Sequence, residues 1–299
     1  MLKSALILLA LANGLLLPAL ANFTFVLRPF LMTLLFFSFL NVKLDRNVFA
    51  WQQFAAAALL PLFGVGIYYL SHWYDDDLAL TLLLMGLAPT AVITPVLAEL
   101  MKRSAAYMVG AIIVSSMAFT LIVPVILTWL LDVELSLAGL GTLIYTIGSI
   151  VIIPMLLAQM VRRIDGKLIM FFRKINPYAF VLFLINVAVA AGSLSHYIQH
   201  ENATPWSFIW LTTGAITLLM LTKFLVGSLI APKGQAVEGS LALGRKNTML
   251  SIWIALEYLN PLIVLGPMIY ILVHQCANFK LDTTLVQCNL SNELTGRQE

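Results

Sequence analysis

The sequence predicts an all-α polytopic membrane protein of about ten transmembrane helices. Of its 299 residues, 61% are hydrophobic and 10% are charged, whereas an ordinary soluble domain is about 25% charged. Apolar runs of about 20 residues, the length of a membrane-spanning helix, follow one another with short connections. The net charge of +3 is too small to suggest nucleic acid as a partner; the lipid bilayer is the expected surrounding.

Ten apolar runs divide the chain into predicted spans. The first run also resembles a secretory signal, because Lys3 precedes an apolar stretch that ends in Ala19-Leu20-Ala21. We interpret that run as a first span. The ten predicted spans are 2–20, 24–41, 48–70, 78–101, 104–131, 136–161, 176–198, 206–230, 236–259 and 261–278.

Charged residues sort to the two sides of this predicted bundle. The connections after spans two, four, six and eight are basic, whereas the opposite connections carry acidic residues and no lysine or arginine. The positive-inside rule therefore places both termini in the cytoplasm. The expected location of the bundle is a plasma or inner membrane. The basic residues are Lys43, Arg46, Lys102, Arg103, Arg162, Arg163, Lys167, Arg173, Lys174 and Lys233; the acidic ones are Asp75, Asp76, Asp77, Asp132, Glu134 and Glu201.

Ten spans divide into two halves of five, residues 1–134 and 135–278, followed by a cytoplasmic tail, 279–299. Because an odd number of spans reverses the direction of the chain, related halves would be inverted repeats. Inverted repeats are common in secondary transporters, which bind substrate on interrupted helices near the membrane midplane.

The fourth span of each half contains helix-breaking residues. Span four has them at 86–90 and at Thr94-Pro95, and span nine at 239–240 and 244–248. Backbone groups freed inside a bilayer must face protein or water. We therefore expect spans four and nine to be discontinuous helices that cross each other.

Arg245 and Lys246 lie in the middle of span nine and indicate the functional centre. One cationic side chain at the centre of a spanning helix costs about 2.5–3.5 kcal/mol, so such residues usually serve a function. Backbone carbonyls of the opposite crossing helix are the structural alternative for these charges. The full set of candidate substrate- or ion-binding residues is Lys246, Arg245, Asn247, Thr248, Thr94, Pro95 and Asn186.

Asn186, in the middle of span seven, has a second interpretation as a helix–helix hydrogen-bonding residue. Lys223, in span eight, is expected to extend its amine to the cytoplasmic interface. The sequence contains no ATP-binding loop, metal-ligand cluster or nucleophile–base arrangement. We therefore expect a secondary transporter rather than an enzyme, with no cofactor and no metal site.

Two stretches resemble a known family of transporters. Residues 80–131 resemble the fourth and fifth helices of the bile acid:sodium symporter superfamily, and residues 241–274 resemble its ninth and tenth. Arg28-Pro29-Phe30-Leu31 and the Phe36-Phe37 region resemble its second helix. The resemblance covers the whole chain in topology and about a third of it in motif.

This resemblance implies a panel, 1–41 plus 136–198, and a core, 48–131 plus 206–278. Spans four and nine would cross within the core, and a small organic anion would bind in the cleft between core and panel. Members of the family commonly use sodium, yet at the family's six sodium-binding side-chain positions only one residue here keeps an oxygen and one is a cation. These positions are Thr94, Pro95, Met108, Ile112, Ala242 and Lys246.

Sodium is therefore a doubtful partner, and we expect the ammonium of Lys246 to replace a coupling cation. A buried lysine can also exchange its proton, which makes Lys246 a candidate for proton coupling. Arg245 would pair with a substrate carboxylate.

Two other interpretations stay open. A cation/proton antiporter of related fold would need a carboxylate within the membrane, and Glu99 and Glu257, both near span ends, are the only near candidates. A chain without sodium ligands is also compatible with a membrane sensor or a partner subunit that transports nothing.

Overall fold

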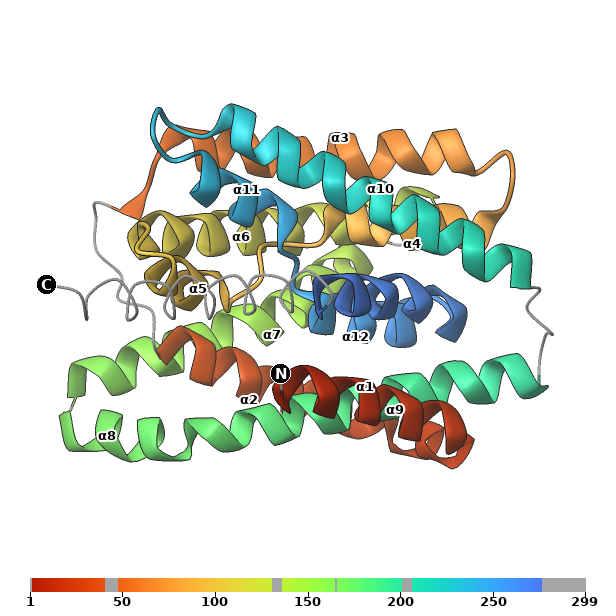
Figure 1. Ribbon diagram of the computed structural model, residues 1–299, viewed down its shortest axis with the longest axis horizontal. Helices are drawn as coiled ribbons and strands as arrows, with labels where there is room; N and C mark the ends of the chain where they lie inside the picture. Colours follow the sequence, from red (N-terminus) through yellow and green to blue (C-terminus); the bar gives the residue numbers. More distant parts are fainter. Residues whose placement is uncertain (1, 41–47, 131–135, 165, 201–205, 276–299) are drawn as a thin grey trace, which may run out of the picture.

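The computed structural model describes residues 2–40, 48–130, 136–164, 166–200 and 206–275 (Figure 1). The predicted tail, 279–299, lies outside the described residues. So do several charged residues of the predicted connections: Lys43, Arg46, Asp132, Glu134 and Glu201.

The described residues form helices joined by short connections. In chain order these are α1 (Leu2–Leu16), η1 (Pro18–Val26), α2 (Leu27–Leu40), α3 (Trp51–Ser71), α4 (Asp76–Leu87), α5 (Thr94–Leu100), α6 (Ala105–Leu130), α7 (Leu137–Ile164), α8 (Gly166–Ile175), η3 (Asn176–Tyr178), α9 (Ala179–His200), α10 (Trp206–Ile230), α11 (Ala236–Gly244), α12 (Thr248–Tyr258) and η4 (Pro261–Val264). Residues 265–275 continue η4 as a helix. The short α8 lies in a segment that the sequence predicted as a connection.

Six described helical stretches are long and apolar enough to cross a membrane, which confirms the predicted class of α-helical integral membrane protein. They are Pro18–Leu40, Trp51–Ser71, Ala105–Leu130, Leu137–Ile164, Leu168–His200 and Trp206–Ile230. Leu2–Leu16 and Pro261–Gln275 are shorter apolar helices.

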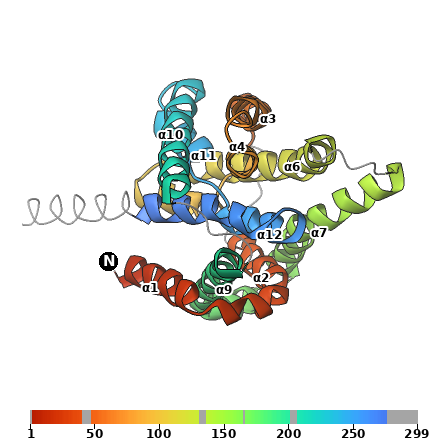
Figure 2. The same cartoon turned by 90° about the vertical axis from the view of Figure 1, so that its right-hand side faces the viewer.

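The helices gather in two groups (Figures 1 and 2). In the first group α9 packs against α1 and α2, and α2 packs against α7. In the second, α3 packs against α4 and α6, and α10 packs against α11 and α4. The groups meet where α12 and η4 contact α9 and where α6 contacts α7. The broken helices α4/α5 and α11/α12 therefore belong to the second group and extend to the boundary with the first.

Two glycines that the sequence placed in the helix breaks lie inside helices instead. Gly86 belongs to α4 and Gly239 to α11, so that part of the prediction was wrong. A Cβ on Gly86 would overlap the backbone of Gly64 on α3, and one on Gly239 would overlap the carbonyl of Gly227 on α10. The glycines are required for close approach of neighbouring helices, as small residues often are in membrane proteins.

The close contact of α4 with α3 gives a stability prediction. Gly86→Ala should lower the free energy of unfolding by about 1–3 kcal/mol, because the new methyl group must displace backbone. Gly66→Ala is the matched control on α3, since nothing lies within 4 Å of its Cβ position. It should be neutral or stabilise the helix by up to about 1 kcal/mol. Thermal unfolding in detergent compares the two; equal transitions would contradict the packing argument.

Candidate functional site

The two broken helices meet as a pair of extended backbone segments. Thr90 and Lys246 form an antiparallel bridge between residues 88–93, which separate α4 from α5, and residues 245–247, which separate α11 from α12. Ala91 N donates to Arg245 O at 2.9 Å, and Asn247 N donates to Pro89 O at 2.8 Å. Each break thus supplies hydrogen-bond partners to the other. Backbone groups that lipid could not hydrogen-bond are therefore satisfied within the protein. We call these segments, with the half-helix ends beside them, the crossing.

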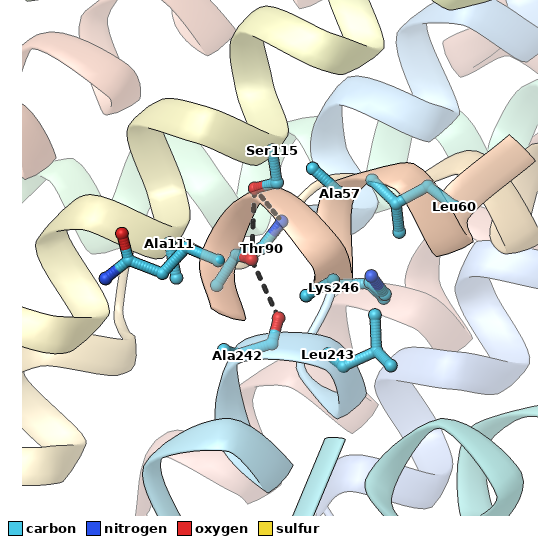
Figure 3. Close-up of a pocket in the computed structure, with 10 residues that line it drawn as sticks. Ala57, Leu60, Thr90, Ala111, Ser115, Ala242, Leu243 and Lys246 are labelled. Atoms are coloured by element: carbon cyan, nitrogen blue, oxygen red, sulfur yellow. Dashed lines mark hydrogen bonds between the residues drawn. The ribbon is translucent and has the colours of Figure 1, made fainter. Parts of the chain in front are cut away.

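Hydroxyl groups tie the crossing to α6. Thr90 Oγ1 donates to Ala242 O at 2.7 Å, and Ser115 Oγ donates to Thr90 Oγ1 at 3.0 Å (Figure 3). Thr90 N donates to Ser115 Oγ, also at 3.0 Å. Sequence reasoning missed both side chains as site residues. The neighbouring Pro89 was a signal for Thr90, whereas Ser115 is one hydroxyl within a long apolar helix.

Lys246 is buried within the crossing. Its side chain extends between Leu60 and Leu243 (Figure 3) and is 3% exposed. Its Nζ forms no hydrogen bond to an oxygen of the described residues. Lys223, on α10, is the other buried lysine at the crossing.

Lys223 does not extend to an interface, so the sequence prediction for this residue was wrong. It is fully buried, and its Nζ donates to Met85 O at 2.9 Å and to Gly86 O at 2.5 Å. Both carbonyls lie in the last turn of α4, where backbone acceptors lack helical partners. In a continuous helix Met85 O would accept from the N–H of residue 89, but Pro89 has none. Gly86 O would accept from the N–H of Thr90, which donates to Ser115 Oγ instead.

The end of α4 favours a positive charge on Lys223. The carbonyl end of a helix carries a partial negative charge, which favours a cation. The Nζ also lies 5.8 Å from the centre of the Phe63 ring, within range of a cation–π interaction. The sequence shows Lys223 only as a lysine in an apolar helix; it does not show that the end of α4 receives it.

Four of the predicted site residues begin helices at the breaks. Asn247 Oδ1 accepts from Leu250 N at 3.3 Å and caps α12, and Thr248 is the first residue of that helix. Thr94 Oγ1 donates to Ala91 O at 2.8 Å, and Pro95 occupies the first turn of α5. These residues therefore shape the crossing.

Arg245 and Asn186 do not line the cavity beside Lys246. Arg245 is buried near Tyr270 and His274 of the last described helix, and the Tyr270 hydroxyl donates to Gly244 O. Asn186 is buried on α9, in the other group of helices, and is not among the residues that line the crossing cavity. Its Oδ1 has no hydrogen-bond partner among the described residues.

The cavity beside Lys246 is small. Its volume is about 10 Å³, and its polar lining residues are Gln53, Thr90, Ser115 and Lys246. This is about the space that one water molecule needs, whereas sites for organic ligands measure hundreds of Å³. In this conformation the crossing is closed to an organic anion.

One buried carboxylate was missed by sequence reasoning. Glu238, on α11, is 3% exposed; its Oε1 accepts from Ser104 N at 3.0 Å, and its Oε2 has no partner among the described residues. Glu99 and Glu257, the carboxylates named from the sequence, are exposed. The sequence signal for Glu238 was a lone acid in an apolar half-helix, one turn before Ala242.

A comparison with models of known protein families finds none that matches this chain. A comparison with curated proteins likewise finds no match.

Proposed function

We propose that this protein is a secondary active transporter of small organic anions, with the architecture of bile acid:sodium symporters. The observation that carries the proposal is Lys246, a buried amine at the crossing of two broken helices. Under this proposal the six long apolar helices, the two shorter ones and the two broken helices would be the ten spans. Under this proposal the first group of helices is the panel and the second is the core.

The residues at the crossing favour an anion over sodium. A hard cation prefers several oxygen ligands, carboxylates above all. The hydroxyls of Thr90 and Ser115 are already used in hydrogen bonds to each other and to the backbone. Met108, Ile112 and Ala242 offer no side-chain oxygen, and Lys246 offers an amine instead of an oxygen.

The transport cycle would open a path between the two groups of helices. The closed crossing corresponds to one stage, and relative movement of panel and core would expose the crossing to an organic anion, as in alternating access by related repeats. The cavity beside Lys246 is lined by residues of the core alone, so α3 would also have to move away from Lys246 for its amine to reach the anion. Lys246 then provides the charge, and Arg245 a bidentate donor for a carboxylate.

Uptake into proteoliposomes tests this function. The purified protein would be given radiolabelled taurocholate and pyruvate, representing bile acids and keto acids, with and without an inward sodium gradient. We expect saturable uptake of at least one probe and no dependence on sodium. Uptake that requires sodium would contradict the expected sodium independence of this protein.

Glu238 supports a second candidate, a cation/proton antiporter of related fold. Such a protein needs a carboxylate within the membrane, and Glu238 is buried on α11, about two turns before the break that follows Gly244. Sodium- or potassium-dependent proton flux in the same vesicles, lost in Glu238→Gln, would favour this candidate. The bond from Ser104 N gives Glu238 a structural role at the start of α6, which is why we rank the candidate second.

A further inference from the structure

Two lysine amines are buried at the crossing, and their surroundings are unequal. Lys223 Nζ has two carbonyl partners, whereas Lys246 Nζ has no oxygen partner among the described residues. An ammonium group has three donors and no acceptor. Two ammonium groups at one buried crossing would repel each other, and the one on Lys246 would have no acceptor for its N–H donors, so we expect one of the two amines to be neutral.

The geometry assigns the charge to Lys223. Its ammonium uses two N–H donors on Met85 O and Gly86 O. The helix end and the Phe63 ring both favour a cation there. If Lys246 carried the charge instead, at least two of its N–H donors would be buried without an acceptor.

We propose that Lys223 and Lys246 form a proton-coupling site that holds one proton in the closed protein and takes up a second when an organic anion binds. Lys223 carries the first proton, and Lys246 is the group that gains and loses the second. The step is Lys246–NH₂ plus H⁺ giving Lys246–NH₃⁺, with the proton taken from water on the side where the anion enters. This inference rests on the proposed transport of an organic anion.

A second positive charge at the crossing needs a negative charge to compensate it, and the crossing itself does not provide one. Other buried ionisable side chains include Arg245 in the crossing, Tyr270 and His274 on the last described helix, Tyr107 on α6 and Glu238 on α11. Glu238 is the one acid in this set, and one of its oxygens is used by Ser104 N. The acids of α4 and α12, Asp76, Asp77 and Glu257, lie at the far ends of those helices.

A bound substrate carboxylate or sulfonate would therefore be the compensating charge. The charged Lys246 stabilises the anion, and the anion stabilises the charged Lys246, so the two bind together. A monoanion and a proton released together on the other side carry no net charge. Transport of a monoanion should thus respond to a pH gradient and not to a membrane potential.

Nitrogen NMR tests the protonation state without any substrate. Full-length protein labelled with ¹⁵N at lysine Nζ would be studied in nanodiscs near neutral pH. We expect one neutral amine signal that disappears in Lys246→Met and persists in the exposed control, Lys233→Met. Only ammonium signals, or an amine signal that persists in Lys246→Met, would overturn the proposal.

Vesicle uptake tests the coupling. Accumulation of taurocholate or pyruvate should rise about tenfold per unit of inward pH gradient and ignore a potential imposed with potassium and valinomycin. Lys246→Arg, which fixes the charge, should remove the pH response. Uptake that ignores the pH gradient would overturn this inference and leave the proposed function standing. The amine signal without any uptake would support the proton site and count against the transport function.

Discussion

Lys246→Gln should abolish organic-anion uptake while the protein stays folded. Glutamine removes the charge that we assign to substrate binding. Removing one partner of a buried ion pair costs about 3–5 kcal/mol, which corresponds to a loss on the order of 100-fold or more. Little structural damage should accompany the loss, because Lys246 Nζ has no oxygen partner among the described residues.

Initial rates of taurocholate and pyruvate uptake into proteoliposomes measure this effect. Lys233→Gln is the matched control, since it makes the same chemical change at an exposed lysine between α10 and α11. It should transport like the wild type. An unchanged rate in Lys246→Gln would remove Lys246 from the substrate site, and with it the main support for anion transport.

Lys223→Met should destabilise the protein more than any other single lysine-to-methionine change in the described part of the chain. The variant leaves the carbonyls of Met85 and Gly86 buried without their donor. Each unsatisfied group costs about 1–3 kcal/mol, so the sum is about 2–6 kcal/mol. Thermal unfolding in detergent, followed by tryptophan fluorescence, measures the change.

Two controls make the comparison specific. Lys233→Met repeats the substitution at an exposed position and should leave the unfolding transition in place. Lys246→Met removes the other buried amine, which holds no carbonyl, and should be close to neutral. Equal transitions in Lys223→Met and Lys246→Met would show that the bonds to α4 contribute nothing to stability.

Much of the fold follows from local sequence. Apolar length identifies the six long helices, because a bilayer requires about 20 apolar residues per span whatever surrounds them. Pro89 and Thr94-Pro95 locate the break between α4 and α5, since proline removes a backbone donor wherever it lies. The polar residues after Gly244 locate the break between α11 and α12. Gly86 and Gly239 were wrongly assigned to the breaks because the sequence alone does not distinguish a glycine that ends a helix from a glycine that allows two helices to pack closely.

The candidate site was predictable only in part. Lys246 and Arg245 were found because the insertion cost of a cation is a property of one segment. The capping roles of Asn247 and Thr94 are local too, yet the sequence assigned these residues to a ligand. Glu238 and Ser115 carried no pattern that separates them from other polar residues in apolar helices.

Local sequence was enough to establish a helical membrane protein with two broken helices and a cation in one of the breaks. Which groups meet at the crossing depends on tertiary packing. Lys223 is separated from Met85 by 138 residues, and nothing local indicates that one would reach the other. Pro89 leaves a carbonyl of α4 without its helical partner, and only the packing of α10 against α4 brings Lys223 to it, at the crossing that also holds Lys246.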